Sequence, residues 1–171
     1  EMDEDDAELT NEEVKEYKWN PASYNVGEGF DKLLKAKYVH GADKMRLVFQ
    51  KMKNIQEYYL KAQSNIEVPT LEHTQLAIVQ HPGVIEIFDK IIRDSLNRCE
   101  MGEHERQTIE ARLNQSLNAI RNYGEWLEKS LLPALSTAKA KNFRIGKDLF
   151  FQKFDYDICT PLMPKSSLKK P

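Results

Sequence analysis

The clearest structural signal in this chain of 171 residues is the stretch MRLVFQKMKNIQEYYLKAQSNI, residues 45–66. Because an α-helix repeats about every 3.6 residues, apolar positions three or four apart lie on one face of it. The stretch keeps this spacing for about six turns, at Met45, Val48, Phe49, Met52, Ile55, Tyr59, Ala62 and Ile66. Lysines, Gln56 and Glu57 take the other faces. It therefore predicts a long amphipathic helix.

Helical spacing also marks five other stretches, which are residues 26–38, 70–79, 82–96, 109–131 and 147–158. Stop and cap residues separate them: Gly41 is followed by Asp43, and Pro69 by Thr70. The sequence has no sustained apolar and polar alternation bounded by hairpin turns. We therefore predict an all-α fold, a bundle of about five to seven helices.

Pro82 lies between two of the periodic stretches. Proline has no amide hydrogen, so it either opens a new helix or kinks a continuous one. We expect a break at Pro82, with one kinked long helix as the alternative.

The amino-terminal residues differ from the helical part in charge and in pattern. Six of the first eight residues are acidic, so we expect residues 1–18 to form a solvated, flexible segment. The next residues, WNPASYN, break the helical spacing, and Pro21 restricts Asn20 to extended geometry. We expect an extended strap there, held to the helices by Trp19 and Tyr24, and a single helical domain over residues 19–158.

Composition excludes several classes of protein. Hydrophobic residues make up 40% of the chain and charged residues 30%, with a net charge of −2, so the whole chain has no attraction to nucleic acid or to an anionic membrane. Cys99 and Cys159 are too far apart in sequence to indicate a disulfide framework or a zinc knuckle. No apolar run approaches the roughly 20 residues of a membrane span, and the acidic start is unlike a signal peptide. If the protein is exported, we expect its leader to lie outside this sequence.

No motif in the sequence indicates catalysis. A helical zinc hydrolase would show two histidines four positions apart with a glutamate between them, and none occurs. His73 and His81 could share a face only if a helix continued through Pro82, and Glu72 beside His73 points about 100° away from it on a helix. There is no nucleophile elbow and no glycine-rich phosphate loop. We therefore predict no catalytic, metal or cofactor-binding residue and no cofactor.

Three ordered blocks carry a resemblance to a known family. They are residues 42–88, residues 119–135 (AIRNYGEWLEKSLLPAL) and residues 142–158 (NFRIGKDLFFQKFDYDI). Their order resembles the amino-terminal half of the bacterial proteins grouped as domain of unknown function 885, over about residues 19–158. Members of that family look like helical zinc-peptidase relatives, often exported or lipid-anchored.

The metal motif of that family is His-Glu followed a few residues later by Gly-His-His, in the second half of its members. This chain has no match to it, so no metal or catalytic residue is carried over. The resemblance implies a helical wall beside a cleft that the missing half would complete, and a periplasmic or lipid-anchored location. The residues that we expect to face a cleft are Tyr59, His73, Gln80 and Arg144. The Arg144 guanidinium could instead form an anchoring ion pair with a neighbouring helix.

The last thirteen residues, CTPLMPKSSLKKP (159–171), lack helical spacing, and we expect an irregular tail. With permitted codon choices, reading from Thr160 one base earlier gives TANAEEFFKKA, a plausible helix start. We hypothesise a frameshifted, truncated gene product, which the nucleotide sequence tests.

These observations lead to three functional interpretations. The first is a non-catalytic helical fragment of a zinc-peptidase-like protein, whose partner is the missing carboxy-terminal half or a second copy. The alternative is a free-standing helical module that binds a protein or peptide. An enzyme using Glu72, His73 and Arg144 is the third, and it requires these groups to converge within about 3 to 4 Å.

Overall fold

The computed structural model describes residues 15–137, with the side chains as far as Ser136. Within this range the elements are η1 (Glu16–Lys18), η2 (Pro21–Tyr24), α2 (Gly27–Lys35), α3 (Gly41–Met52), α4 (Ile55–Asn65), α5 (Leu71–Glu86), η3 (Ile87–Ile92), α6 (Arg93–Asn97), α7 (Glu103–Trp126), η4 (Leu127–Leu131) and α8 (Leu132–Thr137). The expectations for residues 1–14, the helix over residues 147–158, Arg144 and the tail 159–171 lie outside the described residues.

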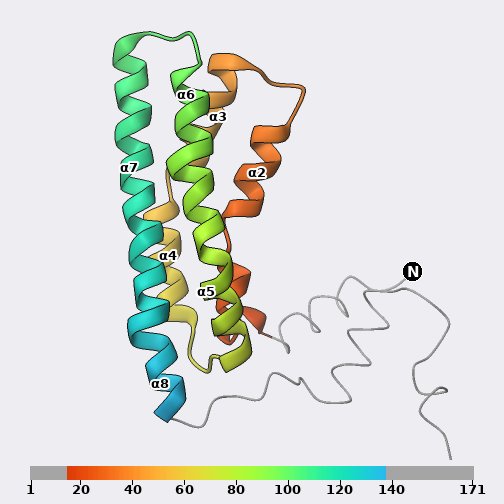
Figure 1. The fold of residues 1–171 in the computed structure, drawn as a ribbon, viewed down its shortest axis with the longest axis vertical. Coiled ribbons are helices and arrows are strands. Elements are labelled where there is room, and N and C mark those ends of the chain that lie inside the picture. Colours follow the sequence, from red (N-terminus) through yellow and green to blue (C-terminus); the bar gives the residue numbers. More distant parts are fainter. Residues whose placement is uncertain (1–14, 138–171) are drawn as a thin grey trace, which may run out of the picture. The chain divides into compact units, whose positions relative to one another are not determined.

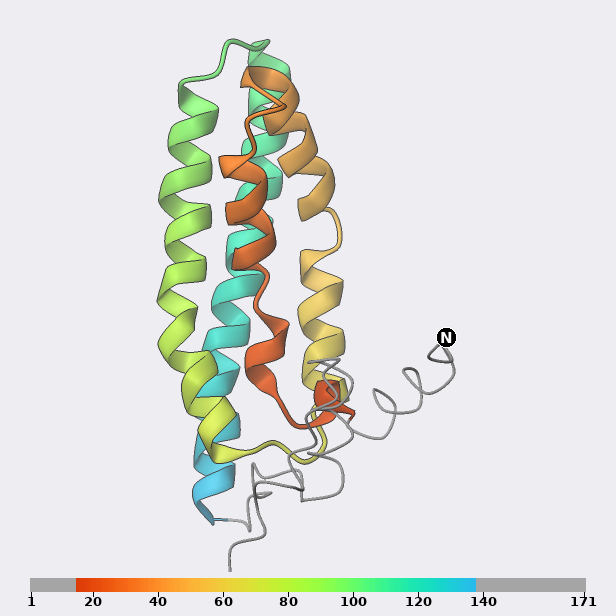
Figure 2. The ribbon, with the colours of Figure 1, turned by 90° about the vertical axis from the view of Figure 1, so that its right-hand side faces the viewer.

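The described helices form an up-and-down bundle (Figures 1 and 2). The chain ascends through α2, descends through α3 and α4, ascends from α5 through η3 into α6, and descends from α7 through η4 into α8. The long helix α7 contacts α3, α4 and α5, while α2 contacts α3 and η3. The predicted all-α class is confirmed. The described part of the chain has four long helical rods when α3 and α4 count as one, a little fewer than predicted.

The apolar stripe of residues 45–66 forms one wall of the core. Its buried members recur at spacings of three and four residues, and they are Met45, Val48, Met52, Ile55, Tyr59, Ala62 and Ile66. The helix itself is not continuous, because it is interrupted between Met52 and Ile55, where Asn54 has φ −111° and ψ 10°. Asparagine competes locally for backbone hydrogen bonds and weakens a helix interior. The prediction of one unbroken helix here is therefore wrong, although the buried face is confirmed.

The α2 helix ends earlier than its apolar spacing predicts. It stops at Lys35, and Tyr38 lies beyond it, 81% exposed. Lys44 of the next helix terminates α2, because its Nζ donates to the carbonyls of Leu34 (2.7 Å) and Ala36 (2.8 Å). Gly41 has φ +54° and opens α3, so the expected stop followed by an Asp43 cap is wrong.

The expected break at Pro82 is also wrong. Pro82 lies inside α5, and the helix continues through it into η3 and α6 as one rod (Figure 1). An interior proline costs a helix about 3 kcal/mol. That cost is offset because Ala77 before it and Val84 and Phe88 after it are all buried in the same core. Pro82 itself is exposed, so water can reach the backbone beside its ring.

The strap of residues 19–25 is held to the bundle as expected, with a different local conformation. Trp19 and Tyr24 are buried, and Asn20 is extended with φ −110° and ψ 92°, as Pro21 requires. Residues Pro21–Tyr24 nevertheless form a 3₁₀ turn, which the Asn20 side chain caps by accepting from the amide of Ala22 at 3.0 Å. The expectation of an extended strap is therefore wrong beyond Asn20.

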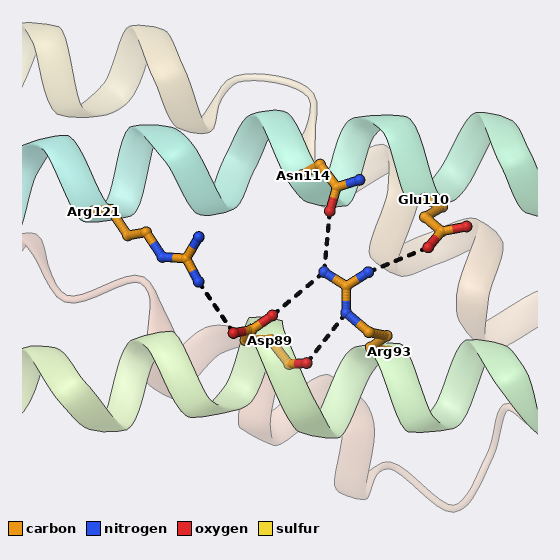
Figure 3. A network of polar contacts seen from close by, with 5 residues as sticks. All are labelled: Asp89, Arg93, Glu110, Asn114 and Arg121. Carbon is orange, nitrogen blue, oxygen red and sulfur yellow. Dashed lines mark hydrogen bonds and ion pairs between the residues drawn. The ribbon is translucent and has the colours of Figure 1, made fainter.

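A network of polar side chains fastens the α5–α6 rod to α7 (Figure 3). Asp89 of η3 accepts from Arg121 of α7 at 3.1 Å and from Arg93 of α6 at 3.4 Å. Arg93 also donates to Glu110 at 3.2 Å and to Asn114 at 3.0 Å, both on α7. Two guanidinium groups face two carboxylates, so the charges cancel within the network. It holds the π-helical turn η3 in place and leaves no net charge for a ligand.

None of the helices in residues 15–137 combines the length and the apolar character that crossing a bilayer requires.

Candidate functional site: a tyrosine-lined cavity

The strap closes a narrow cavity against three helices of the bundle. Its walls come from η2, α4, α5 and α7, and they are Pro21, Ala22, Tyr24, Asn25, Tyr59, Ala77, Gln80, His81, Val84 and Tyr123. The space open to the centres of water molecules is only ≈ 10 Å³. That is about the room one water needs, so the cavity is too small for an organic substrate in this conformation.

Stacked aromatic rings form the inner wall of the cavity. The rings of Tyr59 and Tyr123 stack with centroids 4.5 Å apart, and Trp126 stacks with Tyr123 at 5.6 Å. The Tyr123 hydroxyl donates to the carbonyl of Pro21 at 3.1 Å, and the Tyr24 hydroxyl donates to the carbonyl of Tyr17 at 2.8 Å. The Tyr123 hydroxyl therefore joins the strap to α7, and the Tyr24 hydroxyl joins the strap to the residues that precede it.

Burial sets the protonation state of these tyrosines. It raises the pKa of both Tyr59 and Tyr123 well above the usual range of a phenol, because the charged phenolate would lose its hydration. Neighbouring tyrosines raise the pKa of Tyr123 further. Both side chains remain protonated near neutral pH, so they act as hydrogen-bond donors and are poor general bases.

His81 fills the gap between α5 and α7. Its ring lies against Gly124, where a Cβ atom would come within 2.3 Å of His81 Nε2. Burial lowers the pKa of His81, and the nearby Ile120 carbonyl and the Glu128 carboxylate oppose that shift. Nε2 is buried without a hydrogen-bond partner among the described residues. The neutral imidazole is therefore favoured, and its contact with the bare backbone of Gly124 sets how closely the two helices approach.

The structure brings together two of the four residues predicted to face a cleft. Tyr59 and Gln80 line the same cavity. His73 lies elsewhere: its ring packs edge-on against Trp19 with centroids 5.0 Å apart, and its Nδ1 is 2.7 Å from the hydroxyl of Thr70, the residue that caps α5. Arg144 lies outside the described residues. That these residues face a cleft completed by the missing half stays a prediction.

Sequence reasoning missed Tyr123, whose ring stacks with both Tyr59 and Trp126. It follows Ile120 by three positions on the buried face of α7, and that face is otherwise mostly aliphatic from Ile109 to Leu127. An aromatic residue with a polar tip on a mostly aliphatic stripe, followed three positions later by Trp126, is the signal that could have identified it.

Metal ligands do not gather in the part of the chain that the structure describes. Although the helix does continue through Pro82, no group of three or more His, Cys, Asp or Glu side chains in residues 15–137 lies close enough together to hold an ion.

No family model matches this sequence, and no curated protein is significantly similar to it. A solved structure from Shewanella oneidensis, described as "a putative lipoprotein of unknown function", is similar to it with a TM-score of 0.82 and 33% sequence identity. The likeness covers 89% of this chain and 28% of that chain, so this chain spans little more than a quarter of that protein's length. The comparisons support the helical fold, and the resemblance to domain of unknown function 885 stays a prediction.

Proposed function

We propose that this chain is a non-catalytic helical part of a larger bacterial protein, which is lipid-anchored and resembles zinc peptidases. Its role is a wall against which the remainder of that protein packs. The observation that carries the proposal is the coverage of the similar structure, 89% of this chain against 28% of that one. The description of that protein as a lipoprotein supports a periplasmic or lipid-anchored location. The zinc-peptidase resemblance rests on the three ordered sequence blocks alone.

The outer face of α5 supports the idea of a covered wall. Ala77, Val84 and Phe88 on the inner face of the α5–α6 rod are buried in the core. Away from the core, Val79 is 76% exposed and Leu76 is 44% exposed. The other exposed side chains of α5 include Glu72, Gln75 and Glu86, so Leu76 and Val79, three positions apart, form a small apolar patch with a polar rim. A patch of this kind is typical of a surface that another part of a protein covers.

The non-catalytic role is supported by the state of the cavity groups. The buried phenols are held protonated, and the space between them admits about one water. Tyr123 of α7 donates to the Pro21 carbonyl, and the Asn65 amide of α4 donates to the Tyr24 hydroxyl, so hydrogen bonds from two helices hold the strap on the bundle. These groups stabilise the folded structure. They are not arranged around a space in which a substrate could develop charge in a transition state.

A segment exchange tests the proposal. We would replace the matching segment of the Shewanella oneidensis protein by this chain and introduce Leu76→Glu with Val79→Glu. If the remainder covers α5, the two charges should destabilise the chimera by about 3 kcal/mol or more, because each is buried without a partner. In the free chain the same pair should change stability by less than about 1 kcal/mol, since both sites face water.

Leu60→Glu on α4 serves as the control, because Leu60 is exposed on another element. Urea unfolding of both backgrounds gives the comparison. Equal effects in the chimera and in the free chain would contradict the proposal. A defined one-to-one complex of the free chain with a peptide would favour the free-standing module instead.

A further inference from the structure

The hairpin formed by α2 and α3 carries positive charge in a chain whose net charge is negative. Residues 27–53 contain three acidic side chains, Glu28, Asp31 and Asp43, and a larger basic set: Lys32, Lys35, Lys37, Lys44, Arg46, Lys51 and Lys53. The net charge of the whole chain is −2. Arg46 is paired with Asp43 and with Glu105 of α7, so the positive charge of the hairpin comes from its lysines, a feature that the whole-chain value conceals.

The basic side chains surround exposed apolar ones. An open hollow of ≈ 860 Å³ lies between α2 and α3, and its lining includes Lys32, Lys35, Leu33, Tyr38 and Leu47. Tyr38 is 81% exposed in the connection between the two helices, which projects away from the rods of the bundle (Figure 1). A single exposed ring is ordinary, but Tyr38 and Leu47 both expose apolar surface in one hollow that lysines line. An apolar patch with a charged rim is typical of an interaction surface.

The two helices hold this surface in a defined shape. Lys44 Nζ is bound to the last carbonyls of α2, and Lys51 Nζ donates to the Gly29 carbonyl at 2.8 Å. Lys32 and Lys35 pair with Glu28 and Asp31 one turn earlier in α2, at 2.6 Å each. Those two pairs are exposed and screened by water, so their ammonium groups can turn to another anion.

We propose that the α2–α3 hairpin is a docking surface for the anionic phospholipid headgroups of a membrane. The inference rests on the proposed function, because a lipid-anchored protein works beside a bilayer. A tyrosine ring at the headgroup level keeps its apolar body in the interface and its hydroxyl in water. Lysine stems lie along apolar surface and present their ammonium groups to phosphates. The negative charge on the rest of the chain would turn the hairpin toward an anionic surface.

Vesicle binding by the full chain tests this inference. We would measure co-sedimentation with vesicles of phosphatidylcholine alone and with roughly 30% phosphatidylglycerol, at about 20 and about 150 mM salt. Binding is expected only with the anionic lipid and should weaken as salt rises. Each lysine near an anionic surface is worth roughly fivefold in affinity, so Lys32→Gln with Lys35→Gln should weaken binding roughly thirtyfold.

The matched control is Lys90→Gln with Lys129→Gln. These lysines pair with Glu86 and Glu125 one turn earlier, so the control removes the same charge and the same kind of pair on other elements. It should change binding less than about threefold. Tyr38→Ala should weaken binding several-fold, and Leu60→Ala, which also removes an exposed apolar side chain, should not.

Three results would overturn the inference. The first is equal binding of the chain to neutral and to anionic vesicles. The second is an equal loss of vesicle binding in the two double-lysine variants. The third is that the chain binds an acidic polypeptide such as polyglutamate but does not bind vesicles. The last result would assign the surface to a protein partner. None of them bears on the segment exchange, which tests a different face of the molecule, so the two proposals fail separately.

Discussion

The contact between Gly124 and His81 shows how one missing side chain sets the distance between two helices. A Cβ atom at Gly124 would lie 2.3 Å from Nε2 and 2.4 Å from Cδ2 of the imidazole, far inside van der Waals contact. The ring is wedged between α5 and α7 beside the aromatic wall, so it has little room to withdraw.

We expect Gly124→Ala to destabilise the protein by about 1–2 kcal/mol, because overpacking outweighs the gain in helix propensity. Gly83→Ala is the matched control: Gly83 is also inside a helix, and a Cβ atom added there would meet nothing within 4 Å. That change should stabilise the protein by up to about 1 kcal/mol. Urea unfolding measures both, and a shift of the same sign in the two variants would contradict the packing argument.

The lowered pKa of His81 predicts how the stability of the protein changes with pH. Burial lowers the pKa of His81 below 6.5, the value expected in the unfolded chain, and the Ile120 carbonyl and the Glu128 carboxylate only partly oppose this. As pH falls through about 6.5, the unfolded state therefore takes up a proton before the folded state does, and stability decreases. Above about pH 6.5 neither state binds this proton, so the loss of stability is absent.

We expect the urea midpoint to fall between about pH 7.5 and about pH 5.5 by more in the native protein than in His81→Gln. His104→Gln, which alters an exposed histidine at the start of α7, is the matched substitution control. An identical pH dependence in the native protein and His81→Gln would show that this imidazole does not contribute.

At the scale of elements, the α5–α6 rod shows that packing can override a local signal. Pro82 favours a break, and Asn54 does interrupt a helix whose periodicity is strong. The difference lies in what surrounds each residue. Core residues on both sides of Pro82, together with the network that joins Asp89 and Arg93 to α7, hold the rod together. Asn54 is exposed at the turn between α3 and α4, where an interruption exposes little apolar surface.

If packing alone keeps α5 continuous, Pro82→Ala should stabilise the protein by about 1–3 kcal/mol, because alanine adds the missing amide hydrogen and relieves the ring. Pro69→Ala is the control, because Pro69 precedes the Thr70 cap and lies outside the helix. It should give no gain. Thermal unfolding distinguishes the two, and a loss of stability in Pro82→Ala would show that the π-helical turn η3 depends on the proline.

At the scale of the whole molecule, the distribution of charge and of exposed apolar surface supports the two functional proposals. The chain is weakly acidic overall, yet its α2–α3 hairpin is basic and its α5 helix exposes apolar side chains away from the core. Neither feature can be seen in the net charge or the hydrophobic content of the whole chain. The two proposals therefore concern different elements, an anionic membrane at the hairpin and the remainder of a larger protein at α5.

The candidate site could be predicted only in part. Tyr59 and Gln80 were named from the sequence and line one cavity, but Tyr123 closes that cavity by a hydrogen bond to Pro21, far away along the chain. No local pattern reports such a pairing. His73, also named from the sequence, packs on Trp19, and this contact with a distant segment is equally invisible to a local pattern.

The sequence by itself determined the helical class and the buried stripe of residues 45–66, because periodicity acts within a few turns and needs no partner. Only the tertiary structure decided that Tyr38 is exposed, that α5 runs through Pro82, and that His81 meets Gly124. These outcomes depend on which surfaces meet across the bundle. Burial energy is gained from contacts between distant segments, and it can outweigh the preference of any single residue.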